Sequence, residues 1–292
     1  MTSLVLQGRT AIITGASQGL GRAIAQRFVQ AGASVVLCAR QADTLQQACD
    51  ELRAQAGTGQ AVQALAADVS SPADAAALAQ AALAMTGRID ILVNNAGVYG
   101  PMGPVEEVDW GEWIRALEIN IQGSVLMCRA VLPAMKAQRA GKIIQLSGGG
   151  ATNPMPRISA YAVSKAAIVR FAESLALEVS EYGIDVNAMA PGALNTAMLA
   201  QVLAAGPDKV GRDFYDRSLK QQETGGAGLL PGVNLALFLA SSASDGITGR
   251  LISALWDNWA QWPEHLKELG ASDAYTLRRI AGRDRGLDWG DK

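Results

Sequence analysis

Short apolar runs alternate with longer, alanine-rich amphipathic segments along most of this chain. The apolar runs predict strands at 9–14, 34–39, 61–66, 89–94, 142–147, 184–190 and 249–255. The other segments predict helices near 19–31, 42–56, 72–86, 110–138 (one long helix or two), 160–182 and 229–240. Strands that alternate with helices form βαβ units around a parallel sheet, whose buried strands are apolar almost throughout. The pattern therefore predicts an α/β fold, with a doubly wound, Rossmann-type sheet of about seven parallel strands and helices on both faces.

The composition fits a globular domain and argues against several other classes of protein. Hydrophobic residues make up 49% of the chain, so a sizeable core is available and intrinsic disorder is excluded. The net charge of −2 lacks the basic excess that is typical of nucleic-acid-binding proteins. No apolar run reaches the roughly 18 residues of a membrane span, and the N-terminus has no signal-peptide pattern. We therefore predict a cytoplasmic protein that has neither nucleic acid nor membrane as a partner.

Cysteine and histidine usage narrows the chemistry further. Cys38, Cys49 and Cys128 are odd in number and lack metal-ligand spacing, which indicates reduced, mostly buried thiols. His265 is the single histidine, so we expect neither a histidine-dependent triad nor a multi-histidine metal site.

A glycine-rich turn joins the first predicted strand to the first predicted helix. Glycine permits a tight turn and lets backbone N–H groups approach a phosphate, and the helix start adds its positive dipole end. Such a turn alone is weak evidence, because a plain strand-to-helix turn has the same composition. The candidate cofactor-binding residues in it are Gly15, Ser17, Gln18, Gly19, Leu20 and Gly21.

Polar residues end the third and fourth predicted strands. In a doubly wound sheet the carboxyl ends of the strands line the ligand crevice. Asp68 is expected to accept a hydrogen bond from an adenine amino group, while Asn94 and Gly97 would support the crevice wall and let a ribose approach. The candidate residues here are Asp68, Val69, Asn94, Ala96 and Gly97.

Tyr161 and Lys165 open the long predicted helix at 160–182. Residues four apart share a helix face. A free phenol has a pKa near 10, and a nearby ammonium favours its ionised form. A tyrosine tuned in this way can exchange a proton with an alcohol or carbonyl oxygen. The alternative is a surface pair in which Tyr161 is half-buried.

Taken in chain order, these motifs resemble the short-chain dehydrogenase/reductase family in its compact single-domain form, over about residues 6–255. The resemblance also uses Asn120 and Pro191-Gly192. It implies a nicotinamide cofactor and hydride transfer between an alcohol and a ketone. Tyr161 would be the general acid/base, and Lys165 would lower its pKa and hold the nicotinamide ribose.

The same resemblance assigns three further roles. Asn120 would hold a water molecule that feeds a proton relay. Pro191, Gly192 and Thr196 would border the nicotinamide carboxamide. Residues at about 196–228 would form a mobile lid. Apart from the resemblance, the position of Arg157 just before Tyr161 leaves two alternatives, contact with an anionic substrate group or a solvated loop arginine.

One position departs from the family pattern. The family usually places a serine after the fifth strand to hydrogen-bond the substrate oxygen, and here that position falls on Gly148. Ser147 lies one residue early. Either the glycines at 148–150 let the loop shift so that Ser147 becomes catalytic, or the role is vacant or filled by another group such as Ser159.

The residues after the second strand favour NADP as the cofactor, with NAD as the alternative. Ala39 occupies the position where NAD-preferring members carry aspartate, and Arg40 beside it would pair with a 2′-phosphate. Gln18 argues the other way, because its turn position is often basic in NADP-preferring members. The alternative is that Arg40 caps the strand end in solvent, which leaves the choice between NADP and NAD open.

No repeat or proline-rich linker divides the chain. We predict a catalytic domain over 1–255 and an extension over 256–292, which contains four of the six tryptophans. Tryptophan and arginine favour interfaces, so the extension would contact a neighbouring subunit or the active-site mouth. The alternative is that it packs on its own domain.

The leading function is an NADP-preferring oxidoreductase for a small alcohol or ketone. The family habit is a homodimer or homotetramer through the helices at 110–138 and 160–182. A dinucleotide-binding regulator or scaffold with little turnover is the alternative, motivated by the shifted serine. Nucleotide-sugar epimerisation or dehydration, as in longer relatives, is opposed by the glycine spacing and by the lack of a large substrate domain.

Overall fold

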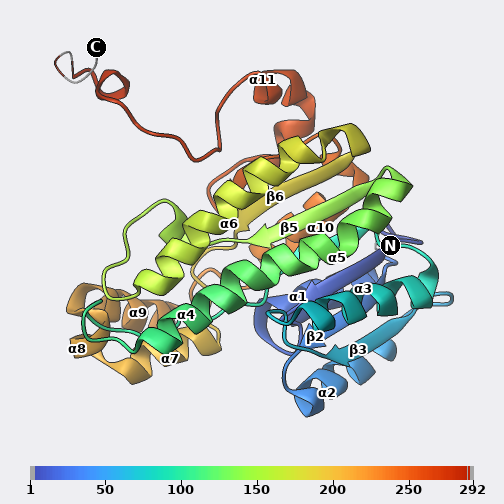
Figure 1. The fold of residues 1–292 in the computed structure, drawn as a ribbon, viewed down its shortest axis with the longest axis horizontal. Coiled ribbons are helices and arrows are strands. Elements are labelled where there is room, and N and C mark those ends of the chain that lie inside the picture. The colour runs from blue at the N-terminus through green and yellow to red at the C-terminus, as the bar shows by residue number, and fades with distance from the viewer. Residues whose placement is uncertain (1–3, 288, 290–292) are drawn as a thin grey trace.

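The centre of the molecule is a sheet of parallel strands (Figure 1). The computed structural model describes residues 4–287 and 289. The strand order is β3-β2-β1-β4-β5-β6-β7, and every neighbouring pair is parallel. The strands are β1 (Thr10–Thr14), β2 (Ser34–Ala39), β3 (Val62–Ala66), β4 (Ile91–Asn94), β5 (Gly141–Leu146), β6 (Ile184–Ala190) and β7 (Leu251–Ser253). The predicted doubly wound, Rossmann-type sheet is confirmed, and the order reverses between β1 and β4, where such sheets bind ligands.

Helices cover both faces of the sheet (Figure 1). One face packs against α1 (Gly19–Gln30), α2 (Ala42–Arg53) and α10 (Leu230–Ala240). The other packs against α3 (Pro72–Thr86), α5 (Gly123–Gln138) and α6 (Ser159–Glu178). Successive strand residues point to opposite faces, so Ile12 and Ile13 of β1 belong to different cores. This explains why most strand residues are apolar.

The predicted helix at 110–138 is interrupted. It consists of α4 (Trp110–Leu117), a π-helical turn at Glu118–Gln122, and α5. Such turns are frequent at functional sites, and this one carries Asn120. The helix predicted at 160–182 likewise ends at Glu178 and is followed by a separate 3-10 turn at Ser180–Tyr182.

Two predicted strands are shorter than expected by two residues or more. The fourth begins at Ile91 rather than residue 89, and the Asp90 carboxylate before it accepts the Thr10 N–H at 2.8 Å. The seventh spans only Leu251–Ser253, because Gly249 has a φ of +68° and the Ser253 N–H turns to the Asp257 carboxylate.

Three helices follow β6 and pack beyond the carboxyl ends of the strands. They are α7 (Ala197–Ala205), α8 (Pro207–Val210) and α9 (Arg212–Thr224), which together occupy the segment predicted as a lid. After β7 the chain forms a 3-10 helix at Trp259–His265, then α11 (Leu266–Gly270), and finally a 3-10 turn at Gly282–Arg285.

The extension packs on its own domain as far as Leu277. The buried Arg250 guanidinium donates to the carbonyls of Leu269, Ser272 and Ala274. The Leu251 N–H donates to the Tyr275 carbonyl, and the Leu277 N–H donates to Glu173. Beyond this point the described chain leaves the body of the molecule (Figure 1).

The remaining structural expectations concern cysteines, metals and membranes. Cys38, Cys49 and Cys128 are free and buried, as predicted. Within residues 4–287 and 289, no group of histidine, cysteine or acidic side chains is arranged to hold a metal ion. Within the same residues, no helix is long and apolar enough to cross a membrane.

Candidate active site

A cavity of about 1430 Å³ runs along the carboxyl ends of the strands. It extends from the glycine turn, past Arg40 and Asp68, to Tyr161 and the helices α7 and α9. Most residues predicted from the sequence line it: Gly15, Ser17, Gln18, Gly19, Leu20, Arg40, Asp68, Val69, Ala96, Gly97, Ser147, Tyr161, Lys165, Pro191, Gly192 and Thr196. Gly21, Asn94 and Asn120 are not among the lining residues.

The glycine turn is fixed to the end of β4. Asn95 donates from its side-chain amide to the carbonyls of Thr14 and Gly15, at 2.9 and 3.0 Å. The Thr14 hydroxyl oxygen accepts the N–H groups of Asn95 and Ala96, both at 3.0 Å. A Cβ atom at Gly21 would collide with the Gly15 carbonyl oxygen and the Asn95 amide. Gly21 therefore lets the turn close against α1 and does not itself line the cavity.

Asn94 does not support the cavity wall as predicted. Its side chain is buried and donates to the Ser124 carbonyl at 3.2 Å, which ties β4 to α5. Asn95, its neighbour, lines the cavity instead. Asn94 is the last residue of β4, whereas Asn95 lies just after the strand and turns to the glycine turn.

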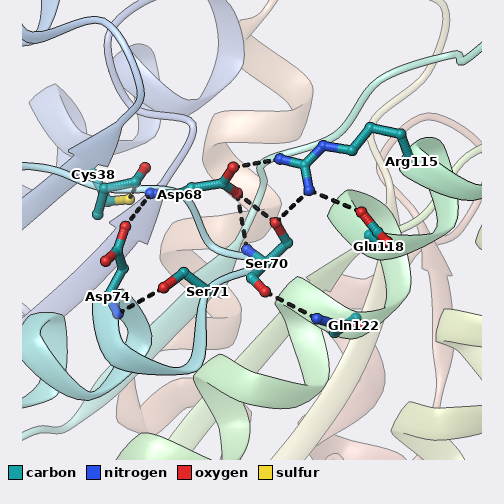
Figure 2. Close-up of polar contacts among 9 residues, drawn as sticks. Cys38, Asp68, Ser70, Ser71, Asp74, Arg115, Glu118 and Gln122 are labelled. Carbon is teal, nitrogen blue, oxygen red and sulfur yellow. Dashed lines mark hydrogen bonds and ion pairs between the residues drawn. The ribbon is translucent and has the colours of Figure 1, made fainter. Parts of the chain in front are cut away.

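Asp68 is part of an ion-pair network (Figure 2). One carboxylate oxygen accepts the Ser70 N–H at 3.0 Å and the Ser70 hydroxyl at 2.7 Å. The other pairs with Arg115, which also pairs with Glu118 at 2.9 Å. Partial burial pushes the pKa of Asp68 upward, but the hydrogen bonds from Ser70 and Arg115 lower it below its usual value. The network therefore keeps Asp68 ionised at the cavity wall and links it to the π-helical turn.

Asn120 has a positioning role in this structure. Its side-chain oxygen accepts the Val98 N–H at 2.9 Å, and its amide donates to the Val98 carbonyl at 2.8 Å and to the Ser164 hydroxyl at 2.9 Å. Both amide hydrogens are thus used, and the side chain is 1% exposed. Asn120 holds the segment after β4 against α6. Its predicted part in a proton relay stays a prediction.

Tyr161 and Lys165 lie together on the first turns of α6, as predicted. The Lys165 ammonium donates to the Leu146 carbonyl at 2.7 Å and lies 5.5 Å from the centre of the Tyr161 ring. Burial lowers the pKa of Lys165 to about 8. Burial, and next the neighbouring Tyr99, raise the pKa of the Tyr161 phenol above its usual value.

The direction of this shift is opposite to the predicted one. The sequence argument placed the ammonium close enough to lower the phenol pKa, whereas in the structure the ammonium is bound to the Leu146 carbonyl and the phenol is buried. Desolvation disfavours the charged form of the phenol, and the neighbouring Tyr99 adds to the upward shift of its pKa. Tyr161 is therefore a neutral phenol that carries a proton at pH 7.

Ser147 lines the cavity, but its hydroxyl makes no hydrogen bond to Tyr161. The Ser147 N–H donates to the Met189 carbonyl and continues the sheet ladder, and its buried hydroxyl has no hydrogen-bond partner among the described residues. A Cβ atom at Gly148 would lie 2.7 Å from the Tyr161 hydroxyl oxygen. Position 148 therefore faces the catalytic candidate. The Ser147 prediction is not supported by this geometry.

Ser159 does not fill the role either. Its hydroxyl accepts a hydrogen bond from the Trp113 indole at 3.0 Å, and it is not among the residues that line the cavity. Sequence reasoning missed a closer group, because the ring of Tyr99 lies 4.7 Å from that of Tyr161 and lines the cavity. The available signal was an aromatic residue two positions after the Asn-Asn-Ala-Gly motif.

The far end of the cavity is formed by segments after β6 and β7. Gly192 has a φ of +95°, and a Cβ atom there would lie 2.6 Å from a methyl group of Leu255. The large lining side chains in this part are Met155, Met198, Leu199, Phe214, Trp256 and Tyr275. Arg157 donates to the Asp208 carbonyl at 2.6 Å and is not among the lining residues, so it joins its loop to α8.

Comparison with known proteins agrees with this geometry. A family model described as short chain dehydrogenase matches residues 9–206. A short chain dehydrogenase of Pseudocercospora fijiensis is 41% identical over 195 residues, which cover 66% of this chain and 62% of that protein. The oxidoreductase UcpA of Escherichia coli K12 is 38% identical, over 84% of this chain and 92% of its own.

Solved structures of dehydrogenases are also similar to this chain. A putative NAD(P) dependent gluconate 5-dehydrogenase from Beutenbergia cavernae, with bound NADP, has a TM-score of 0.75 at 33% identity and covers 89% of this chain and 98% of its own. Structures of this fold include NAD⁺-bound as well as NADP-bound proteins. The chain therefore belongs to the short-chain dehydrogenase family, a class of oxidoreductases that bind NAD or NADP.

Proposed function

We propose that this protein is an NADP-preferring oxidoreductase that interconverts a small ketone and its alcohol, with Tyr161 as the general acid/base. One observation carries the proposal: Tyr161 and Lys165 lie in the same cavity as the glycine turn, at the switch point of the sheet. The bound nicotinamide would supply or accept the hydride. The turn fits such a group, because its glycines leave the backbone uncovered and Arg40 lines the cavity at the end of β2.

Each residue then has a defined task. Tyr161 is a neutral phenol at pH 7, so it is ready to donate its proton to a carbonyl oxygen, which favours ketone reduction. Lys165 keeps its ammonium beneath the phenol ring and is held there by the Leu146 carbonyl. Asn120 fixes the segment at Val98 that borders both.

Arg40 supports the preference for NADP. It is exposed at the end of β2, lines the cavity, and has Ala39 and Gln41 as neighbours rather than an acidic residue. We expect Arg40→Ala to lower kcat/KM with NADPH by about 10- to 100-fold, the value of one charge-assisted hydrogen bond, and to leave the value with NADH nearly unchanged.

The measurement is steady-state kinetics with both cofactors. Arg279→Ala, which removes an exposed arginine outside the cavity, serves as the matched control and should change neither value. An equal loss with NADPH and NADH, or a wild-type protein that prefers NADH, would contradict the assignment.

The substrate end of the cavity supports an apolar carbonyl compound. Methionine, leucine, phenylalanine and tryptophan side chains line it together with Tyr275, Gln201 and Gln221, whereas the cations that line the described cavity, Arg40 and Lys165, lie on the cofactor side. Such a surface suits small alicyclic or aromatic ketones better than a carboxylate. These ketones are therefore the first to assay.

The missing hydroxyl at Gly148 favours a second candidate, a dinucleotide-binding regulator with little turnover. Oxidation of NADPH in the presence of ketones distinguishes the two functions. The regulator binds NADPH but oxidises none of it across a panel of ketones, whereas the enzyme turns over.

Assembly and location extend the proposal. We propose a homodimer or homotetramer through α5 and α6, supported by an apolar groove on α4 and α5 that is lined by Ile114, Leu117, Ile121, Val125 and Leu126. We propose α7–α9 as a lid, since all but α8 contribute lining residues to the cavity.

We also propose that the protein is cytoplasmic. Its free, buried cysteines fit the reducing environment of that compartment.

A further inference from the structure

The substrate oxygen lacks its expected second hydrogen-bond donor. Position 148 faces Tyr161 but carries no side chain, while the Ser147 hydroxyl is buried without a partner and the Ser159 hydroxyl is bound to the Trp113 indole. In a reaction that places charge on the oxygen, one missing donor typically costs on the order of 10²–10³ in rate. A side chain that restores this hydrogen bond should lie in the cavity, beside Tyr161, with a free polar hydrogen.

Tyr99 is held rigidly beside Tyr161. The residue before it, Val98, has both backbone polar groups paired with the Asn120 side chain. The residue after it, Gly100, has a φ of +75°, and a Cβ atom there would lie 2.7 Å from the Ala116 methyl group and 3.3 Å from that of Ala160. The Tyr99 backbone is therefore clamped between α4, α6 and the π-helical turn.

The Tyr99 side chain meets the remaining conditions. Its ring lies 4.7 Å from that of Tyr161 with the planes inclined by 58°, and it lines the cavity. None of the described residues hydrogen-bonds its hydroxyl, so the hydroxyl is available to a ligand. Burial raises the pKa of Tyr99, so this phenol keeps its proton and acts as a donor.

We propose that the Tyr99 hydroxyl donates a hydrogen bond to the substrate carbonyl oxygen, in the place that the family gives to a serine. The oxygen would then lie between two phenols. In reduction, the hydride of the reduced nicotinamide adds to the carbonyl carbon and the nicotinamide is oxidised. Tyr161 gives its proton to the oxygen, whereas Tyr99 keeps its own throughout. This inference rests on the proposed function.

Tyr99→Phe tests the hydroxyl without removing the ring. We expect kcat/KM for ketone reduction to fall by about 10²–10³-fold, while the Kd of NADPH stays within a factor of about two. Tyr182→Phe is the matched control, because Tyr182 lies outside the cavity next to Lys136, and it should retain wild-type activity. Activity of Tyr99→Phe within about threefold of wild type would overturn the inference.

A second measurement does not depend on turnover. Isobutyramide presents a carbonyl oxygen that NADPH does not reduce, and its binding to the NADPH complex is measured by calorimetry. We expect Tyr99→Phe to raise its Kd about tenfold and Tyr182→Phe to leave it unchanged. Equal affinities in wild type and Tyr99→Phe, or no binding to wild type, would contradict the role of Tyr99. Failure of turnover with an intact difference in binding would instead contradict the proposed function alone.

Discussion

Tyr161→Phe is expected to lower kcat for ketone reduction by about 10²–10⁴-fold, the usual contribution of a general acid. The phenol is buried at the cavity, and its raised pKa keeps the proton that the reaction consumes. Phenylalanine keeps the ring packing against Tyr99 but has no proton to give. The measurement is the single-turnover rate of NADPH oxidation at saturating ketone.

Cofactor binding separates this result from misfolding. Trp256 lines the cavity, so quenching of tryptophan fluorescence gives the Kd of NADPH in both proteins. We expect Tyr161→Phe to bind NADPH within a factor of about two of wild type. A variant that binds NADPH normally and still turns over within tenfold of wild type would show that another group donates the proton.

Lys165→Met is expected to lose turnover by at least about 10²-fold while gaining stability. The ammonium is buried, and the fall of its pKa from 10.5 to about 8 corresponds to a penalty of about 3 kcal/mol for holding the charge in the folded protein. Methionine removes that penalty but also the charge-assisted hydrogen bond to Leu146, which offsets about 2 kcal/mol. The expected net gain at pH 7 is about 1 kcal/mol.

The stability advantage of Lys165→Met over wild type should decrease as the pH rises. Between pH 8 and 10.5 the unfolded chain binds more protons at Lys165 than the folded protein, so the free energy of unfolding of wild type rises with pH. Below pH 8 the penalty is fully present. The advantage of Lys165→Met should therefore shrink as the pH rises through this interval, as measured by urea unfolding without cofactor. An advantage that is absent at pH 7, or that grows with pH, would contradict a buried, destabilising ammonium.

The sheet was predictable because its strands are buried on both faces. The runs at 34–39 and 184–190 have the same bounds in β2 and β6. Both are largely buried, and the polar residues within β6 have partners, since Asp185 pairs with Lys142 and Asn187 donates to the Ile247 carbonyl. Element ends were less predictable where side chains compete for backbone groups, as Asp90 does before β4 and Asp257 does after β7.

The site was predictable where backbone shape or helix spacing determines it. Gly15 and Gly19 form the turn, and Tyr161 and Lys165 share a face of α6. Long-range contacts were not predictable from local spacing. The pairing of Arg115 with Asp68 joins residues 47 positions apart, and Tyr99 meets Tyr161 through the packing of α4 and α6.

The direction of the Tyr161 pKa shift was missed for a related reason. Spacing alone indicated a cation near the phenol, but it did not indicate that the Leu146 carbonyl binds this cation or that the phenol is buried. Burial penalises the ionised phenol, and the extent of burial is set only when the chain has folded. The result changes the expected resting state from a readily ionised phenol to a neutral acid.

Transfer of deuterium from NADPH in which both hydrogens at the reactive nicotinamide carbon are replaced by deuterium distinguishes an oxidoreductase from a dinucleotide-binding regulator. The protein is incubated with the labelled cofactor and a small alicyclic ketone, and the product is analysed by mass spectrometry. We expect the alcohol formed by wild type to carry one deuterium at its carbinol carbon. We expect almost no labelled alcohol from Tyr161→Phe, although both proteins bind NADPH. Intact NADPH binding without deuterium transfer by wild type, across alicyclic and aromatic ketones, would contradict an oxidoreductase and favour a dinucleotide-binding regulator.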